Sequence, residues 1–586
     1  MEAVLKGSPM TNKAQILRIK GLSGLDIPVL LFTGSAYLSA LAFNPPPYNT
    51  DKLMGLALLL VLYFVFRWLF PLFEKQKIQT VCCFILILSG LVEALWGLRQ
   101  LYGFAPSQHA LFRLTGSFFN PGPYAGYLAV VFPLSLHFGM YGRLPVLRGL
   151  AAITCIAVIL VLPATMSRAA WLAALAGSAA VVGTGSTRHP LPVVKRPSAF
   201  FKGWRIGRAL TVGIVVLLLL AALTGMYFLK KNSADGRALI WKLSLQTLVH
   251  HPLGAGLGNF SGAYGETQAA YFASGRASET EALVAGNPEY GFNEYLQIGI
   301  ESGIVSLLLF IVLLIRAFRC LRRKKDGGVM GALTALAVFA CFSYPFGVWP
   351  FLIVFVFLLA SSHPDSALKR SMAGTGSTLH PLPVAKRPLA FFGGWRIKFA
   401  MTGLFLIAFF CLYKQYPVYR ANKTWNEKRM YYQSGRYREA IQSYEPLYPY
   451  LNDRVQFLFE YAQCLSKTGI NGGQGMEERV RRDNLIRSNK VLQRAMQISC
   501  DPMLYNILGK NYQAMKEYAP AEAAYIRATQ LVPSRLYPWY LLTKLYDEMG
   551  LTDKACETAK IVLTKEPKVQ SPAVREMRSE VKKYCP

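Results

Sequence analysis

Many hydrogen-bonding side chains lie at the start of an apolar run, in the stretch "AGNPEYGFNEYLQIGIESGIVSLLLF". Its amides and carboxylates are Asn287, Glu289, Asn293, Glu294, Gln297 and Glu301. Amides and carboxylates bind sugar hydroxyls, and a carboxylate can also accept the proton of an attacking hydroxyl. We therefore expect this stretch to orient a hydroxyl-rich molecule.

Three arginines in other segments could supply the complementary positive charge. They are Arg168 in "TMSRAAWLA", Arg237 in "DGRALIWKLSLQTLVHHPLGAGLGNF", and Arg276. A guanidinium fork binds phosphate oxygens in pairs. The Gly- and Pro-rich turn "TGSFFNPGPYAGYLA" adds Asn120 and Tyr124 as hydrogen-bonding groups. Together these residues would suit a diphosphate attached to a sugar.

Apolar runs must position these groups, because 53% of the chain is hydrophobic and 16% is charged. The runs are about as long as a helix that crosses a bilayer, roughly 17–25 residues. We interpret eleven of them as membrane spans. The tenth is short, and the fifth and sixth abut. They lie near residues 27–43, 53–70, 78–98, 124–140, 146–165, 166–182, 208–229, 298–318, 329–345, 348–361 and 399–417.

The distribution of lysine and arginine predicts the orientation of these spans. A basic leader, residues 1–26, precedes the first run, which has no cleavage motif and reads as an anchor. With the leader in the cytoplasm, segments 99–123, 163–168 and 230–296 are external, and so is the C-terminal domain. Most of the formal charge of +32 then serves to orient the spans in the membrane. Nucleic-acid binding is not expected, because the basic residues flank spans and do not form a patch interleaved with aromatic residues.

One segment of the chain is duplicated. Residues 183–206 recur as residues 374–397 with 20 of 24 positions identical, and both copies fall in predicted inner loops. Such a loop could contact anionic lipid or a partner. We favour a duplication that the loops tolerate.

The sequence after residue 417 has a different pattern. "LYNILGKNYQAMKEYAPAEAAYIRATQLVPSR" has Gly509, Tyr512, Ala521 and Pro533 at positions typical of tetratricopeptide repeats, and related units precede and follow it. The predicted fold is all-α: a polytopic membrane bundle of about eleven spans, followed by an α-solenoid. The predicted domains are a cytoplasmic leader (1–26), a transmembrane domain (27–417) with external loop 230–296, and an extracytoplasmic repeat domain (418–586).

The cysteines do not indicate a cofactor. The chain has no C-x-x-C motif and no Cys/His cluster that would predict a metal. Cys464, Cys500, Cys556 and Cys585 lie in the predicted external domain, where an oxidising compartment would permit disulfides.

The motifs "GSFFNPGPYAGYL", "SRAAWLA", "GRALIW…HPLGAGLGNF" and "FNEYLQIGIESGIVSL", in this order, resemble the O-antigen ligase and polymerase superfamily over roughly residues 80–345. The resemblance implies a GT-C-like glycosyltransferase of the bacterial cytoplasmic membrane that needs no metal. Its substrate would be an undecaprenyl-diphosphate-linked glycan, and its acceptor a lipid A core, another glycan or a protein. Arg168 and Arg237 match positions that hold the diphosphate, and the repeats would bind the acceptor or a protein partner.

The chain departs from the family pattern at one position. The resemblance implies a histidine before the asparagine of "FNEYLQ", and Phe292 lies there instead. A phenylalanine cannot accept a proton from the acceptor hydroxyl. The candidates for this role are Glu289, Glu294, Glu301, His250 and His251, of which we favour Glu294 or Glu289. The alternatives are a repeat-unit polymerase, a protein O-oligosaccharyltransferase, or a non-catalytic membrane scaffold or exporter that binds partners through its repeats.

Overall fold

The structure is a computed structural model that describes residues 24–43, 50–72, 75–185, 231–363, 395–472, 477–568 and 570–585. Most of the basic leader, the predicted span near 208–229 and most of both copies of the duplicated segment lie outside these ranges. Every regular element in the described ranges is a helix, which confirms the all-α prediction.

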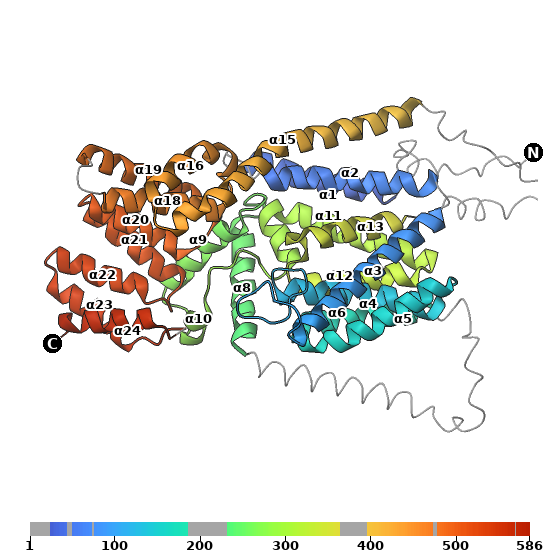
Figure 1. Ribbon diagram of the computed structural model, residues 1–586, viewed down its shortest axis with the longest axis horizontal. Helices are drawn as coiled ribbons and strands as arrows, with labels where there is room; N and C mark the ends of the chain where they lie inside the picture. The colour runs from blue at the N-terminus through green and yellow to red at the C-terminus, as the bar shows by residue number, and fades with distance from the viewer. Residues whose placement is uncertain are drawn as a thin grey trace, which may run out of the picture.

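Nine helices run side by side and form a bundle (Figure 1). They are α1 (Asp26–Phe43), α2 (Thr50–Leu72), α3 (Lys75–Leu101), α4 (Pro121–Tyr141), α5 (Pro145–Val161), α6 (Arg168–Gly185), α11 (Glu294–Lys324), α12 (Gly327–Ala340) and α13 (Trp349–Ser361). The short 3₁₀ helices η1 (Pro163–Thr165) and η2 (Pro345–Gly347) lie in the turns before α6 and α13. Helix α4 is apolar on every side and is buried over most of its length, as expected for a helix surrounded by others. Small residues let α6 and α12 approach closely. A Cβ added at Gly177 of α6 would lie 2.6 Å from the Gly331 carbonyl of α12.

Three helical segments within the described ranges are long and apolar enough to cross a membrane: Ile78–Leu101, Pro145–Thr165 and Glu294–Lys324. Shorter apolar helices cover Asp26–Ala42, Arg168–Thr184, Gly327–Ala340 and Trp349–Ser361. The predicted membrane character is therefore supported. The count of eleven spans is supported only in part, because several predicted runs form shorter or less uniformly apolar helices.

Helix α11 is broken at Gly303, whose φ of 85° ends the first turns and starts a new helix. The segment Pro252–Gly256 fills the break: Ala255 and Gly256 donate to the carbonyls of Ile300 and Glu301, and Ile304 donates to Pro252. A broken helix in a membrane protein is tolerated where other parts of the chain take over its hydrogen bonds. The polar stretch 294–302 is thereby separated from the apolar helix that follows it.

Three helices lie between the bundle and the C-terminal part (Figure 1). Helix α8 (Lys231–His250) crosses one end of the bundle, and α9 (Phe260–Ala273) and α10 (Glu279–Val284) pack beside it. Leu239, Leu243 and Thr247 are the buried side of α8. Helix α8 begins six residues before Arg237.

The C-terminal part is a series of helices that pack in consecutive pairs, α18 with α19, α20 with α21 and α22 with α23. Its helices are α15 (Trp395–Gln433), α16 (Tyr437–Tyr444), α17 (Tyr448–Leu451), α18 (Val455–Ile470), α19 (Glu478–Ile498), α20 (Pro502–Ala514), α21 (Tyr518–Leu531), α22 (Tyr537–Glu548), α23 (Thr552–Thr564) and α24 (Pro572–Val581), with short 3₁₀ helices η4 (Glu445–Leu447) and η5 (Lys582–Tyr584). Gly509 packs against the ring of Tyr525, so a small residue lies where α20 and α21 touch. Assignment to tetratricopeptide repeats stays a prediction. Helix α15 runs without interruption through the predicted boundary at residue 417.

Helix α9 makes a close contact with the C-terminal helices α19 and α21. Gly262 lies against the backbone carbonyl of Gln497, and Gly265 lies against Cys500. A hydrogen bond joins Ser261 to Cys500, and an ion pair joins Glu266 to Arg527. Two glycines of α9 therefore let the backbones of the two parts approach closely at this contact.

Candidate functional site

Arg237 lies on α8 at the end of the bundle. Its Nη1 donates a hydrogen bond of 3.1 Å to the carbonyl oxygen of Phe342, in the turn between α12 and α13. Its guanidinium also lies 5.2 Å from the centre of the Phe292 ring. One carbonyl and one ring face leave several of the five guanidinium N–H donors for a ligand.

Arg168 is the first residue of α6 and acts on Arg237 electrostatically. Burial lowers the pKa of Arg237, and the positive charge of Arg168 lowers it further. Two cations that repel each other at a partly buried position are a recognised sign of an anion site. The N-terminus of α6 adds its own partial positive charge there. The structure thus brings together two predicted residues that are 69 positions apart in the sequence.

An aromatic layer lies beside Arg237. The rings of Tyr290 and Tyr344 stack with their centres 4.5 Å apart, and Phe292 meets Tyr344 edge-on at 5.4 Å. Trp241 lies one turn after Arg237 on α8 and packs on Phe342. The indole nitrogen of Trp241 is buried and has no hydrogen-bond partner among the described residues. Apolar ring faces exclude water from the charged groups beside them, which strengthens their electrostatic interactions.

Phe292 has a backbone φ of 48°, which is unusual for a residue with a bulky side chain. Such strain is often found at functional sites. The conformation places the ring against the guanidinium of Arg237 and the edge of Tyr344. The residue that replaces the expected histidine is therefore part of the arginine site.

The three candidate carboxylates all act electrostatically on Tyr290. Burial raises the pKa of Tyr290, and the charges of Glu289, Glu294 and Glu301 raise it further. Glu294 is buried and accepts a 2.6 Å hydrogen bond from the backbone of Phe346.

Glu301 is buried too, and it is engaged by two side chains. Its carboxylate forms a 3.0 Å ion pair with Lys52 and accepts a hydrogen bond from Gln297. Glu289 is exposed. Of the three carboxylates, Glu289 is thus the one that solvent and a ligand can reach.

The predicted hydrogen-bonding groups near α11 have structural roles. Asn293 caps α11 by accepting from the backbone of Leu296, and Gln297 accepts from Gly291. Asn287 accepts a 3.3 Å hydrogen bond from Arg535 of the C-terminal part. These contacts hold the 285–301 stretch in shape, and they place Asn287 at the junction between the two parts.

The remaining predicted residues lie in other surroundings. Asn120 caps α4, and the fully buried Tyr124 donates to the carbonyl of Glu93. Arg276 is on the exposed turn between α9 and α10, where it donates to Ser274. These contacts stabilise turns and do not join the arginine site.

Sequence reasoning missed the segment that supplies Phe342 and Tyr344. The sequence did contain a reason to include this segment, because the turn "CFSYPFG" joins two apolar runs on the side predicted to be external. In the described ranges no group of three or more His, Cys, Asp or Glu residues could hold a metal ion.

The arginine site lies between α6, α8 and the turn after α12, within a continuous part of the sequence that also carries the carboxylates. Residues 153–311 match the O-antigen ligase family model. This O-antigen ligase region begins in α5 and ends in α11, so it contains Arg168, Arg237 and the whole 285–301 stretch. No curated protein and no solved structure matches the chain.

Proposed function

We propose that this protein is a membrane glycosyltransferase that transfers a glycan from an undecaprenyl-diphosphate carrier to an acceptor hydroxyl on the outer side of the cytoplasmic membrane. The observation that carries the proposal is the electrostatic interaction of Arg168 with Arg237 at one end of an apolar bundle, within the residues that match the O-antigen ligase family model. Two guanidinium groups beside a helix N-terminus suit the two phosphates of such a carrier.

The contacts support one orientation for the whole chain. Helix α8 and the C-terminal helices lie at one end of the bundle (Figure 1), and Arg237 of α8 bonds Phe342 in the turn before α13. These are the segments for which the distribution of lysine and arginine predicts an external position. The proposal therefore places the N-terminus in the cytoplasm, and the C-terminal helices outside it.

The transfer step uses the arginines to stabilise the leaving group. The acceptor oxygen forms a bond to the anomeric carbon while the bond from that carbon to the phosphate oxygen breaks. The diphosphate leaves on its lipid with one more negative charge, which Arg168 and Arg237 neutralise. Attack from the face opposite the leaving group inverts the anomeric centre.

The acceptor proton requires a base, and we assign this role to Glu289. Its exposure allows it to reach an acceptor, and its charge acts on Tyr290 within the aromatic layer. Glu294 and Glu301 are engaged by Phe346 and Lys52 and serve to position the surrounding segments.

The test is Arg237→Ala in a deletion strain, with profiles of lipopolysaccharide, capsule and glycoproteins. Loss of a leaving-group donor is expected to reduce transfer by about 10²–10³-fold, so that the carrier-linked glycan accumulates. Arg276→Ala is the matched control, because Arg276 is exposed and bonds Ser274. Unchanged transfer by an inserted Arg237→Ala protein would exclude the diphosphate role. The profile that changes also separates a ligase from a repeat-unit polymerase and from a protein glycosyltransferase.

A further inference from the structure

A line of polar contacts joins the start of α2 to the 285–301 stretch. The ammonium of Lys52, in the first turn of α2, lies 3.0 and 3.1 Å from the two carboxylate oxygens of Glu301. The amide nitrogen of Gln297 donates to the same carboxylate at 3.0 Å. The amide oxygen of Gln297 accepts a 3.1 Å hydrogen bond from the backbone N–H of Gly291. Lys52 is therefore connected through side chains to the residue directly before Phe292.

Burial makes the charge of Lys52 important for these contacts. Glu301 and Gln297 are 6% and 7% exposed, whereas the Lys52 side chain is 41% exposed. A buried carboxylate that loses its cation is unfavourable, and its surroundings rearrange to neutralise it or to admit water. Lys52 therefore provides the positive charge that a carboxylate in this position requires.

The carboxylate in turn fixes the orientation of Gln297. The nitrogen of an amide side chain donates and its oxygen accepts, whereas an ionised carboxylate can only accept. The nitrogen of Gln297 must therefore face Glu301, which leaves its oxygen toward the N–H of Gly291. If the carboxylate were neutral or displaced, the amide could turn over and Gly291 would lose its acceptor.

The bond to Gly291 matters because of the residue that follows. Phe292 has a φ of 48°, a conformation that persists only where the surrounding structure holds it. Its ring lies 5.2 Å from the guanidinium of Arg237. A backbone that relaxes at Gly291 would let this ring move away from Arg237.

The turn of α2 that carries Lys52 also contacts the C-terminal part. The neighbouring Asp51 forms an ion pair with Arg454, at the start of α18. Lys52 itself lies outside the O-antigen ligase region, which covers residues 153–311. Its contact with Glu301 thus connects a helix outside that region to the arginine site within it.

We propose that Lys52 is a positioning residue for glycan transfer. Its charge holds Glu301 and thereby orients Gln297. Gln297 then keeps the Gly291–Phe292 segment against Arg237. The inference rests on the proposed function for the reaction that it affects, and it adds a residue from outside the O-antigen ligase region to the arginine site.

The test compares Lys52→Met with the parent protein in nanodiscs, using donor and acceptor extracted from the deletion strain. Methionine is about as long as lysine but has no charge. Lys52→Met is expected to lower kcat about ten- to a hundredfold and to change KM less, because a misplaced Arg237 stabilises the leaving group poorly. Hydrogen exchange of the peptide that contains Gly291 should become faster. Parent values of both kcat and exchange would overturn the inference.

Two rescue variants separate positioning from a general loss of stability. Lys52→Arg keeps a cation beside Glu301 and is expected to transfer near the parent rate. The double variant Lys52→Met with Glu301→Gln removes both charges, and the new amide oxygen can still accept from Gln297. It is expected to recover most of the lost kcat and the slow exchange at Gly291. A double variant as impaired as Lys52→Met would overturn the inference, because Lys52 would then not act through Glu301.

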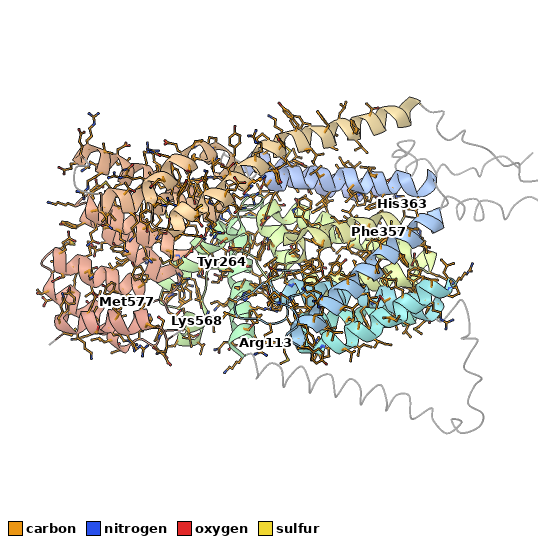
Figure 2. The ribbon with its side chains drawn as sticks, viewed as in Figure 1. Arg113, Tyr264, Phe357, His363, Lys568 and Met577 are labelled. Atoms are coloured by element: carbon orange, nitrogen blue, oxygen red, sulfur yellow. The ribbon has the colours of Figure 1, made fainter. Side chains whose placement is uncertain are left out.

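Tyr63→Phe is the matched control on the same helix. The hydroxyl of Tyr63 donates a 2.8 Å hydrogen bond to the buried carboxylate of Asp26, which His363 also contacts at 3.2 Å. Figure 2 shows His363 toward the end of the bundle away from the C-terminal helices. Tyr63→Phe thus removes a buried bond to a carboxylate outside the arginine site, and kcat and exchange at Gly291 should match the parent. Equal losses in Tyr63→Phe and Lys52→Met would overturn the inference, because both would then reflect the stability of the bundle.

The exchange measurement also distinguishes this inference from the proposed function. Gln297→Leu removes the acceptor of Gly291 directly, and exchange there should be as fast as in Lys52→Met. This comparison involves no transfer, so its outcome does not depend on the reaction. Unchanged transfer by Arg237→Ala would exclude the proposed function and leave the exchange result standing. Fast exchange in Gln297→Leu but not in Lys52→Met would overturn the role of Lys52.

Discussion

At the scale of single residues, the arginine site depends on contacts that a family pattern does not contain. Phe292 occupies the position of the expected histidine and provides a ring face for Arg237. The ring cannot accept a proton, but it can hold a guanidinium in place with an attraction of about 0.5–2 kcal/mol. The substitution therefore exchanges one possible role in proton transfer for a role in positioning the cation.

Replacing Phe292 by leucine tests this positioning role. The change removes the cation–π contact and is expected to lower kcat/KM for transfer about two- to thirtyfold. Phe292→Tyr keeps the ring and is the matched control, with transfer near the parent level. A leucine variant as active as the tyrosine variant would show that the ring does not position Arg237.

The sequence predicted some residues of the arginine site and misjudged others. Arg168 and Arg237 were predicted from residue type and resemblance, and the structure brings them together. The sequence could not separate Glu289 from Glu294, because their difference lies in the distant backbone of Phe346, which only the fold brings to Glu294. Arg276 was predicted from charge alone, and its exposure became evident only in three dimensions.

At the scale of elements, α8 is held to α10 by an ion pair between Lys242 and Glu281. The two side chains are 2.7 Å apart, and Tyr271 donates to the same carboxylate. Burial alone would raise the pKa of Glu281, but hydrogen bonds from Lys242, Ser278 and Tyr271 lower it to about 2. The helix that carries Arg237 is thereby joined to α10, which directly precedes the 285–301 stretch.

The depressed pKa of Glu281 predicts how this junction responds to acid. A carboxyl with a lowered folded-state pKa stabilises the fold above its ordinary value of 4.5, and this contribution is lost as pH falls toward about 2. Hydrogen exchange in α10, corrected for intrinsic rates, should stay constant from neutral pH to about 5 and then accelerate. Glu281→Gln should exchange faster at neutral pH and lose most of that dependence. The same acid profile in both proteins would contradict the prediction.

Gly262 of α9 gives a second prediction for an element. A Cβ there would collide with the backbone carbonyl of Gln497, which cannot rotate away as a side chain could. Gly262→Ala should therefore separate the C-terminal helices from α9, so that limited proteolysis cleaves between them while the bundle stays inserted. Gly149→Ala is the control, because a Cβ on that glycine of α5 meets nothing within 4 Å. Equal protease resistance of the two variants would show that the junction tolerates the methyl group.

The sequence pattern predicted these elements better than it predicted their interruptions. The apolar run near residues 298–318 predicted the apolar part of α11. The break at Gly303 was not predicted, because its hydrogen bonds come from Pro252–Gly256, about fifty residues earlier in the chain. Pairing of this kind depends on the packed arrangement and leaves no local periodicity.

At the scale of the whole molecule, the bundle and the C-terminal helices form one continuous assembly. Helix α15 extends from the bundle into the C-terminal part, and α9 contacts the same part from the other side (Figure 1). Helix α8, which carries Arg237, lies at this junction. An acceptor held by the C-terminal helices would therefore be close to the arginine site.

The predicted external position of the C-terminal part has a chemical test. The Sγ atoms of Cys556 and Cys585 lie 3.0 Å apart. In an oxidising compartment, exchange with an oxidised thiol oxidoreductase would remove two electrons and two protons and join them as a disulfide. Peptide mapping without reductant should recover the two cysteines in one linked pair, while Cys464, which is fully buried, stays reduced. Recovery of Cys556 and Cys585 as free thiols from freshly blocked cells would argue for a cytoplasmic position.

Helix α15 has a further consequence for how such a chain can change during evolution. Each residue of an α-helix advances the chain by about 1.5 Å and turns it by about 100°. Inserting a single residue into the 39-residue α15 would therefore rotate everything beyond it, yet the attachment at Gly262 and Gly265 resists any such rotation. The contact of α9 with the C-terminal helices therefore constrains the length of α15. Insertions and deletions should accumulate outside α15, or occur there only with compensating changes along α9.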